Sequence, residues 1–233
     1  MAFQFKQFTV EDDRSSMKVG TDAVLLGSWA CPENRLYTLE IGCGSGLISL
    51  MLAQKMKGFI TAIDIDKDSA EQAHQNFMAS KWNNKLESIH TSLQQFLKQS
   101  YKKFDIIISN PPFFNNSLNS PYKNRTLSKH TNTLSYPELV KGIKKLLKQD
   151  GIVYIILPYE ESKEFIFLMR KADFCLSKEC LVIPKENKEA NRILMEFSYK
   201  DSELTSEKLY IRNKDNSYTE KYKQLCKDYY VNL

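Results

Sequence analysis

Short apolar runs alternate with helically spaced apolar residues along the centre of the chain. The apolar runs predict buried strands at 37–42, 59–64, 86–91, 104–109 and 152–157. The helical spacing predicts helices at 47–56, 66–80, 137–147 and 160–171, and two closing strands are expected at 175–183 and 192–199. Repeated alternation of strands and helices is typical of a parallel α/β sheet that is covered by helices on both faces.

The chain contains no internal repeat and no low-complexity linker, so we expect a single domain. We expect an N-terminal arm at 1–35, the α/β domain at 36–200 and a C-terminal tail at 201–233. In the tail, tyrosines are interleaved with lysines between Tyr218 and Tyr230. Such a surface can stack on RNA, but aromatic residues at helical spacing more often dock a tail onto its own domain. We therefore expect the tail to be docked.

The composition argues against a membrane protein or a secreted protein. Of the 233 residues, 42% are hydrophobic and 26% are charged, as in ordinary globular proteins. The longest apolar run, Ile152 to Leu157, is far shorter than the roughly 20 residues of a membrane span. Lys6, Glu11 and Asp12 lie where a signal peptide needs an apolar stretch. We therefore expect a cytoplasmic protein.

Neither the cysteines nor the histidines have the spacing of a metal site. The five cysteines form no CxxC pair, and the three histidines are scattered along the chain. We therefore expect no bound metal. The odd number of cysteines fits reduced thiols better than a disulfide framework.

The net charge of +5 is concentrated in one part of the chain. Between Lys98 and Lys148, ten Lys and Arg stand against Asp105 and Glu138, a net charge of +8, which leaves −3 for the rest. A concentrated basic region suits a phosphate backbone. A solvated helix face explains the same charges equally well, so charge alone leaves nucleic-acid binding open.

A glycine-rich loop follows the first strand of the predicted sheet. Gly42, Gly44 and Gly46 have the spacing GxGxG, and glycine lets a backbone turn tightly and approach a ligand without a Cβ in the way. Glu40 precedes the loop, and Asp64 ends the second strand, where an acidic side chain can accept hydrogen bonds from ribose hydroxyls. A carboxylate before the loop suits a cationic sulfonium better than a pyrophosphate. The pattern looks like the nucleoside-binding half of an S-adenosylmethionine-dependent methyltransferase.

The sequence Asn110-Pro111-Pro112-Phe113 directly follows the strand at 104–109. Ligands of doubly wound sheets lie beyond the carboxyl ends of the strands, so this loop is expected beside the cofactor. The Asn110 side-chain oxygen and the Pro111 carbonyl can accept both hydrogens of a conjugated amine, which turns the nitrogen lone pair toward the methyl group. Phe113 can stack on a planar acceptor that has left its own stack. The motif resembles that of methyltransferases acting on adenine N6, guanine N2 or glutamine Nδ, and by itself it does not choose among them.

Further stretches extend the resemblance beyond these two motifs. They are the N-terminal MKVGTDAVLLGSW and then, in order, LEIGCGSGLISLMLAQ, AIDID, IIISNPPFF and TEKYKQLCKDYY. With them the chain is similar almost end to end to the bacterial valine-tRNA adenine-37 N6-methyltransferase family. The resemblance implies a Rossmann-like sheet of seven strands. It also implies transfer of a methyl group from S-adenosylmethionine to N6 of the adenine beside the valine tRNA anticodon.

The resemblance implies roles for individual residues as well. The cofactor would be held by Glu40, Asp64 and Asn110 together with the loop glycines Gly42, Gly44 and Gly46. Lys18, Thr21 and Asp22 would close over its methionine end. The catalytic residues would be Asn110, Pro111, Pro112 and Phe113.

One stretch departs from the family pattern. Many relatives carry an aspartate after the third strand that binds the amino group of the cofactor's adenine, whereas this chain reads His90-Thr91-Ser92-Leu93-Gln94. The Ser92 hydroxyl or the Gln94 amide can make such a bond. We therefore expect weaker cofactor binding at most.

The stretch from Phe113 to His130 is long, polar and loop-like, and it contains Tyr122, Lys123, Arg125 and Lys129. Long loops in compact domains are often functional, and proteins that recognise RNA usually bind loops whose bases splay out and stack. We expect this stretch to be disordered without RNA and to contact the anticodon arm of a tRNA.

The loop at 184–192 carries both charge signs and is more typical of a solvated hairpin. We expect a monomer that binds tRNA and no membrane.

Three alternatives stay open. A protein-glutamine N5-methyltransferase shares the Asn-Pro-Pro loop but typically has a separate N-terminal helical domain, for which about 35 residues leave no room. A guanine-N2 methyltransferase of ribosomal RNA is closer, although such chains usually carry an additional domain. An RNA-binding module with an idle methyltransferase fold would not need Glu40, Asp64 and Asn110 together.

Overall fold

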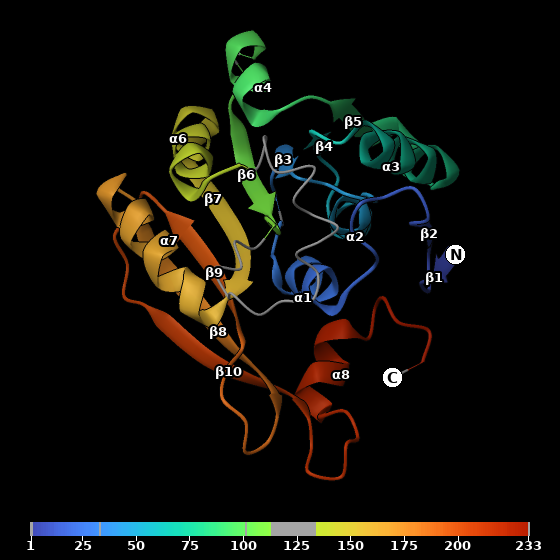
Figure 1. The fold of residues 1–233 in the computed structure, drawn as a ribbon, viewed down its shortest axis with the longest axis vertical. Coiled ribbons are helices and arrows are strands. Elements are labelled where there is room, and N and C mark those ends of the chain that lie inside the picture. Colours follow the sequence, from blue (N-terminus) through green and yellow to red (C-terminus); the bar gives the residue numbers. More distant parts are fainter. Residues whose placement is uncertain (1, 33, 101, 113–133, 233) are drawn as a thin grey trace, which may run out of the picture.

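A mixed sheet of eight strands forms the centre of the molecule (Figure 1). The computed structural model describes residues 2–32, 34–100, 102–112 and 134–232. The order of the strands across the sheet is β10-β8-β9-β7-β6-β3-β4-β5. Their bounds are β3 Tyr37–Ile41, β4 Phe59–Asp64, β5 Leu86–His90, β6 Phe104–Ser109, β7 Leu147–Pro158, β8 Cys175–Lys185, β9 Arg192–Ser198 and β10 Thr205–Arg212. A small hairpin, β1 Ala2–Gln4 with β2 Thr9–Glu11, stands beside it.

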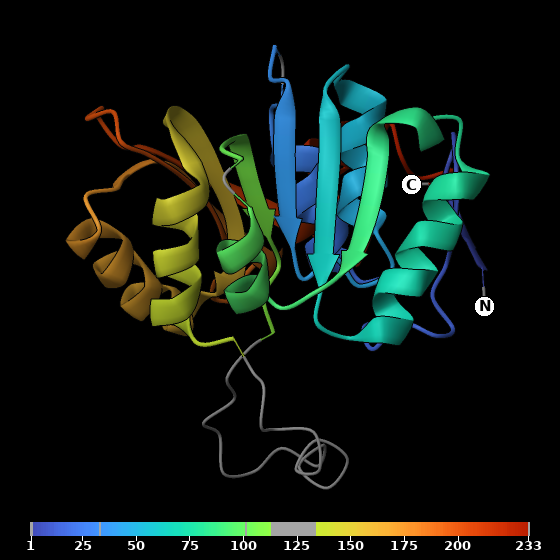
Figure 2. The ribbon, with the colours of Figure 1, turned by 90° about the horizontal axis from the view of Figure 1, so that it is seen from above.

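Helices cover both faces of the sheet (Figure 2). One layer contains α1 Thr21–Trp29, α2 Leu47–Lys55 and α3 Lys67–Ala79, with α8 Glu220–Cys226 against α1. The other contains α4 Leu93–Gln99, α6 Tyr136–Leu146 and α7 Tyr159–Lys171, and a short 3₁₀ turn, η1, spans Asn83–Lys85. No helix within the described ranges is long and apolar enough to cross a membrane.

The apolar strands supply side chains to two cores at once. In β6, Ile106 and Ile108 pack under α1, α2 and α3, whereas Ile107 packs under α4, α6 and α7. Successive side chains of a strand point to opposite faces, so a strand between two helical layers carries apolar residues on both faces. This explains why short apolar runs, such as the three isoleucines of β6, predicted the central strands correctly.

Local sequence determines where several helices begin. Asp66 caps α3 by accepting a hydrogen bond from the Ser69 amide, and Ser92 caps α4. Ser135 and Glu138 form a reciprocal capping box at the start of α6. Each cap satisfies amides that have no partner within the helix.

The sheet differs from expectation in strand number and direction. It has eight strands rather than seven, since β10 pairs in parallel with the outer edge of β8. It is not wholly parallel, because β9 runs antiparallel to both β7 and β8. In β10 only Leu209 is buried, so this strand has no apolar run from which it could be predicted.

Three helices, α1, α4 and α8, were not among the predicted elements. In α1 the residues from Val24 to Trp29 are all buried, so no polar face marks a helical period. The short helix α4 buries only Leu93 and Phe96. β7 also starts earlier than predicted, at Leu147, where the helical pattern of α6 had been expected to end.

The C-terminal residues pack on the N-terminal part of the chain. Tyr229 is buried, and its hydroxyl donates to the Met51 carbonyl over 3.1 Å. The Gln54 side chain donates to the Asp228 carbonyl, and the Lys6 amide donates to the Tyr229 carbonyl over 2.8 Å. The C-terminal residues are therefore held against α2, and Lys6 is held against these C-terminal residues.

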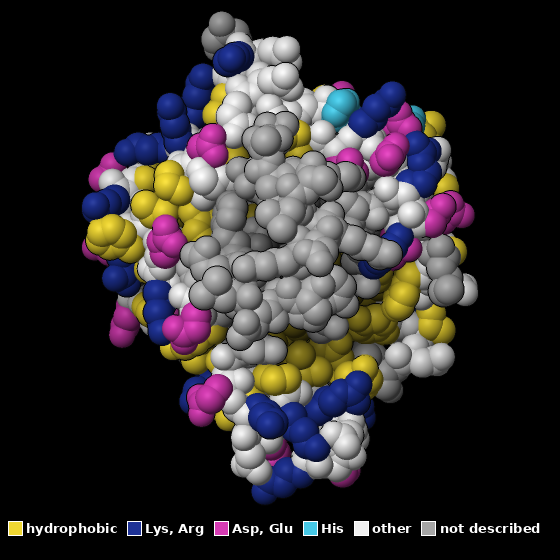
Figure 3. All heavy atoms as spheres, in the orientation of Figure 1, with side chains coloured by type: hydrophobic (Ala, Val, Ile, Leu, Met, Phe, Trp, Pro, Cys, Tyr) yellow, Lys and Arg dark blue, Asp and Glu magenta, His cyan; other side chains and the backbone are white. Residues whose placement is uncertain are grey.

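Most described basic residues of the +8 segment lie away from the carboxyl edge of the sheet. Lys103 and Lys148 stand where β6 and β7 begin, which is the opposite edge, and Lys144 lies in the last turn of α6. Lys148 pairs with Asp105 over 2.8 Å. Figure 3 shows the face formed by the carboxyl edge, where another group of Lys and Arg covers the connections that follow β8 and β10.

The docking of the C-terminal tail can be tested with two tyrosines. Tyr229→Ala removes a buried ring and its hydrogen bond to Met51, so we expect it to lower the free energy of unfolding by about 3–5 kcal/mol. Tyr210→Ala, at a side chain that is 37% exposed, should cost less than about 1 kcal/mol. Urea unfolding followed by circular dichroism measures both. Equal stability of the two variants would contradict tight docking.

Candidate active site

Two cavities open where β3, β4 and β6 end at the carboxyl edge of the sheet. The first, of about 290 Å³, is lined by the start of α1, by Glu40 and by the glycine loop. The second, of about 410 Å³, is lined by the ends of β4 and β6 and the start of α4. Met17, Gly42, Gly44 and Asn110 line both cavities. The two cavities therefore adjoin each other, with a junction at these four residues.

The glycine loop has a backbone that few other residues can adopt. Gly42, Gly44 and Gly46 all have positive φ, at 75°, 54° and 79°. A Cβ on Gly46 would lie 2.5 Å from a ring carbon of Phe77, so α3 packs directly on the loop. The absence of a side chain at Gly46 therefore allows α3 to pack on the loop, and Gly46 lines neither cavity.

Asp64 links the glycine loop to the next turn of the chain. One carboxylate oxygen accepts from the Gly44 amide over 2.8 Å, and the other accepts from the Asp66 amide over 2.9 Å. Burial raises the pKa of Asp64, although these two amide bonds oppose the shift. The side chain lines the second cavity and keeps further lone pairs for a ligand.

Glu40 lies fully buried at the end of the first cavity. Ser49 of α2 donates both its amide and its hydroxyl to one oxygen, Oε2. The other oxygen, Oε1, is buried and has no hydrogen-bond partner in the described structure. Burial outweighs the bonds from Ser49 and raises the pKa of Glu40 to about 8. The carboxyl group thus presents one unsatisfied acceptor that a cationic donor would satisfy.

Asn110 lies at the junction of the cavities, directly after β6. The Ser109 hydroxyl donates to the Ile41 carbonyl over 2.7 Å and fixes the end of β6 beside β3. The Asn110 side-chain oxygen is buried and has no partner among the described residues. Pro111 and Pro112 line the second cavity. An orphaned amide oxygen is costly unless a ligand donor reaches it.

The N-terminal arm and the start of α1 close the first cavity. Lys18, Thr21 and Asp22, to which the resemblance assigns the methionine end of the cofactor, line it. The Lys18 ammonium donates to the carbonyls of Asp12 and Asp13, so this charged group is bound to the N-terminal arm. Asp22 accepts from the Arg192 guanidinium over 2.8 Å, which connects α1 to β9.

The start of α4 forms the far side of the second cavity. Ser92 and Gln94, the expected replacements for the family's aspartate, both line it, and so does Thr91. The Ser92 hydroxyl accepts from the Gln95 amide as the cap of α4. The Gln94 amide nitrogen donates to Glu138 over 2.9 Å. Ser92 still has a hydroxyl proton to donate, whereas Gln94 is held by α6.

The structure brings together the predicted site residues that it describes, except Gly46. The structure does not describe Phe113, Tyr122, Lys123, Arg125 and Lys129. The expectation that this stretch is disordered without RNA concerns the same residues, which lie outside the described part of the chain. The sequence analysis missed Met17, which lines both cavities, and Ser49, which holds Glu40. A signal for Ser49 exists, since it is a serine within the apolar stretch of α2.

Carboxyl groups outnumber basic side chains among the described lining residues. Asp22 and Glu40 line the first cavity, and Asp64 and Asp66 line the second. Such a site attracts a ligand with positive charge and hydrogen-bond donors. In the described parts of the chain, no three His, Cys, Asp or Glu side chains are grouped as a metal ion would require.

Comparison with known proteins places the chain among methyltransferases. The family model described as "Methyltransferase small domain" matches residues 19–171. Among solved structures, a predicted O-methyltransferase from Agrobacterium tumefaciens has a TM-score of 0.72 at 16% identity, covering 91% of this chain and 100% of that one. A ribosomal protein L11 methylase from Lactobacillus delbrueckii has a TM-score of 0.59 at 17% identity, covering 82% and 84%. At these identities, the two structures establish the fold alone.

Curated relatives match over nearly the whole chain. The tRNA1(Val) (adenine(37)-N6)-methyltransferase of Parabacteroides distasonis is 39% identical over 99% of this chain and 98% of its own length. The protein of the same name from Pseudoalteromonas translucida is 40% identical over 99% of both. The cavities between β3, β4 and β6 lie within the region that the family model matches, apart from the arm residues before position 19. The chain therefore belongs to the methyltransferase small domain family and, within it, to the family of tRNA1(Val) (adenine(37)-N6)-methyltransferases.

Proposed function

We propose that the protein transfers a methyl group from S-adenosylmethionine to N6 of adenine-37, beside the anticodon of valine tRNA, as a cytoplasmic monomer. The observation that carries the proposal is the buried side-chain oxygen of Asn110, which has no partner among the described residues and lies at the junction of the two cavities. The names of the relatives supply the substrate, since both are described as acting on this adenine of this tRNA.

The chemistry of the lining fits S-adenosylmethionine. Glu40 Oε1 offers an unsatisfied acceptor to the ammonium group of the methionine part. Asp64, at the end of β4, offers acceptors to the ribose hydroxyls, and Ser92 offers a hydroxyl to the adenine edge. The acidic lining suits the positive charge of a sulfonium. When bound, this cofactor supplies an electrophilic methyl group.

Asn110 and Pro111 would prepare the acceptor nitrogen. The amino nitrogen of adenine is a poor nucleophile because its lone pair is delocalised into the ring. Hydrogen bonds from its two hydrogens to Asn110 Oδ1 and the Pro111 carbonyl would draw that lone pair out of the ring. The nitrogen would form a bond to the methyl carbon as the bond between that carbon and the sulfonium sulfur breaks, and the electron pair of the broken bond would stay on sulfur, which leaves as a neutral thioether. The nitrogen would keep one hydrogen and release the other as a proton to water. Rate enhancement would come from positioning and polarisation.

The tRNA would approach the carboxyl edge of the sheet, where both cavities open. Lys and Arg gather on this face over the connections after β8 and β10 (Figure 3), which suits a phosphate backbone. We include Phe113 as the side chain that stacks on the extruded adenine. Tyr122, Lys123, Arg125 and Lys129 are proposed to contact the anticodon arm.

Replacing Asn110 tests the catalytic loop. Asn110→Ala removes the acceptor for one amino hydrogen, so methyl transfer to tRNA should fall by about 100-fold or more. Transfer is measured with methyl-labelled S-adenosylmethionine and total bacterial tRNA, and the product is digested to nucleosides. We expect N6-methyladenosine, and none from a valine tRNA transcript with guanine at position 37.

Asn84→Ala, at an exposed asparagine outside the site, is the matched control and should keep full activity. Label in ribosomal RNA as N2-methylguanosine, or in a protein fraction as methylglutamine, would replace the substrate assignment by one of the two alternatives. Full activity of Asn110→Ala would rule out the catalytic role of this residue.

The high pKa of Glu40 predicts proton release on cofactor binding. Near pH 6.5 a carboxyl group with a pKa of about 8 is protonated in the free protein. An ammonium group at Oε1 favours the charged form, so binding should release about one proton. Calorimetric titration in two buffers of different ionisation enthalpy measures this number.

Glu40→Gln should release no proton and bind S-adenosylmethionine about 10- to 100-fold more weakly. Its affinity for 5′-methylthioadenosine, which lacks the ammonium group, should stay close to that of the wild type. Unchanged affinity of Glu40→Gln for S-adenosylmethionine would show that Glu40 does not meet the cofactor.

Charge reversal tests the proposed RNA contacts. Replacing Lys123, Arg125 and Lys129 together by Glu should weaken tRNA binding by about tenfold or more and lower its dependence on salt. Filter binding over a range of salt concentrations measures both effects. The same three changes should leave affinity for S-adenosylmethionine unaltered, and unchanged tRNA affinity would remove these residues from the interface.

A further inference from the structure

Met17 occupies a central position in the site. It lines both cavities, and the other residues that do so are Gly42, Gly44 and Asn110. Two of these are glycines, which add no side chain. Met17 and Asn110 are therefore the two side chains at the point where the cavities join.

The arm that carries Met17 is folded into a closed loop. Asp12 accepts from the Val19 amide over 2.9 Å through its carboxylate and from the Ser15 amide over 3.2 Å through its carbonyl. The buried Ser15 lies at the tip of this loop, against the glycine loop, since a Cβ on Gly44 would lie 3.4 Å from its hydroxyl. The loop at 12–19 thus rests on the backbone that shapes both cavities.

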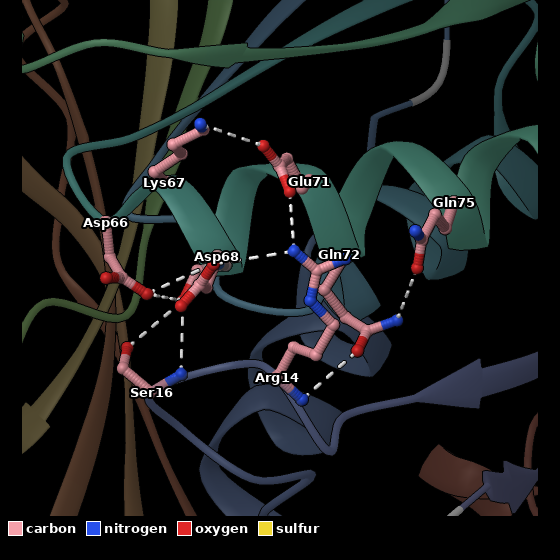
Figure 4. A network of polar contacts seen from close by, with 9 residues as sticks. Arg14, Ser16, Asp66, Lys67, Asp68, Glu71, Gln72 and Gln75 are labelled. Atoms are coloured by element: carbon pink, nitrogen blue, oxygen red, sulfur yellow. Dashed lines mark hydrogen bonds and ion pairs between the residues drawn. The ribbon is translucent and has the colours of Figure 1, made fainter.

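Side chains of α3 hold this arm in place (Figure 4). Gln72 accepts from the Arg14 amide over 3.2 Å, and the Arg14 guanidinium contacts Asp68 and Glu71. Asn76 accepts from the Glu11 amide and donates to the carbonyls of Glu11 and Ser45 (each 2.8 Å), and so connects the arm to the glycine loop. The last anchor, Ser69, accepts from the Ser16 amide over 3.1 Å.

Ser69 also belongs to a chain of hydrogen bonds that ends at the cofactor site. Its hydroxyl donates to the Asp66 carboxylate over 2.7 Å, so its two lone pairs are left for the Ser16 amide and hydroxyl. The Asp66 amide in turn donates to Asp64, which holds Gly44. The carboxylate assigned to the ribose and the residue before Met17 are thereby joined through buried or half-buried polar groups.

The Met17 side chain is 44% exposed, although it stands at this junction. An exposed, flexible thioether at a cavity junction can pack on a ligand that fills the cavity. We propose that Met17 covers the cofactor where its methionine and adenosine parts meet, and that Ser69 is the positioning residue that sets Met17 there. This inference rests on the cofactor named in the proposed function and adds a contact residue and its anchor.

The proposed contact between Met17 and the cofactor can be tested by comparing variants of Met17 and Met78. Met17→Ala should bind S-adenosylmethionine about tenfold more weakly, whereas Met17→Leu should retain most of the affinity. Met78→Ala removes a methionine that is 55% exposed on α3 and lines neither cavity, so it should bind as the wild type does. Binding is measured by calorimetry without tRNA.

A spectroscopic measurement tests the same contact in the unaltered chain. With ¹³C-labelled methionine methyl groups, adding S-adenosylmethionine should shift the Met17 resonance and leave that of Met78 in place. The spectra of Met17→Ala and Met78→Ala identify the two signals, because each variant lacks one of these methionines. An unmoved Met17 signal, or full affinity of Met17→Ala, would overturn the proposal. Failure of the wild type to bind S-adenosylmethionine would instead overturn the proposed function.

A double-mutant cycle tests the role of Ser69. Ser69→Ala should weaken cofactor binding, and Ser69→Thr, which keeps the hydroxyl, should restore it. If Ser69 acts through Met17, the double variant Met17→Ala with Ser69→Ala should bind little more weakly than Met17→Ala alone. Fully additive losses would show that Ser69 acts independently of Met17, and would remove it as the anchor.

Discussion

The arrangement of the site depends on the Asp64 carboxylate. Its two oxygens accept from the amides of Gly44 and Asp66, so one buried group fixes both the glycine loop and the turn into α3. α3 then carries Ser69, Gln72 and Asn76, which hold the N-terminal arm. A carboxyl group with a raised pKa therefore holds three segments that are far apart in the sequence. Disturbing it would move the loop, the turn and the arm together.

The elements that were predicted correctly from the sequence are those that their own residues favour, without contacts to distant segments. Strands β4 and β6 supply apolar side chains to both cores because helices cover both faces, so a mainly apolar run is evidence for each, whereas β3 supplies Leu39 and Ile41 to one core only. The site residues Glu40, Asp64 and Asn110 were predictable for a related reason. They stand at the ends of such strands, where parallel connections bring polar residues to one edge.

The missed features depend on contacts between distant segments. β10 has one buried residue, Leu209, and becomes a strand only because the edge of β8 is free to pair with it. Met17 and Ser69 look ordinary in the sequence, and their positions follow from the packing of the arm on α3. The charge argument met the same limit, since Lys103 and Lys148 belong to the same basic segment as the Asn-Pro-Pro loop but lie at the opposite edge of the sheet.

The contact between the N-terminal and C-terminal residues affects the order in which parts of the protein can fold. Phe5 forms a bridge with Tyr230, and the Lys6 amide donates to the Tyr229 carbonyl, so the residues that follow β1 take partners from the residues that follow α8. On the ribosome, Phe5 emerges long before that partner has been synthesised. Contacts between such distant residues also form slowly, because a large loop must close first. Phe5 and Lys6 therefore lack these two partners until Tyr229 and Tyr230 have left the exit tunnel.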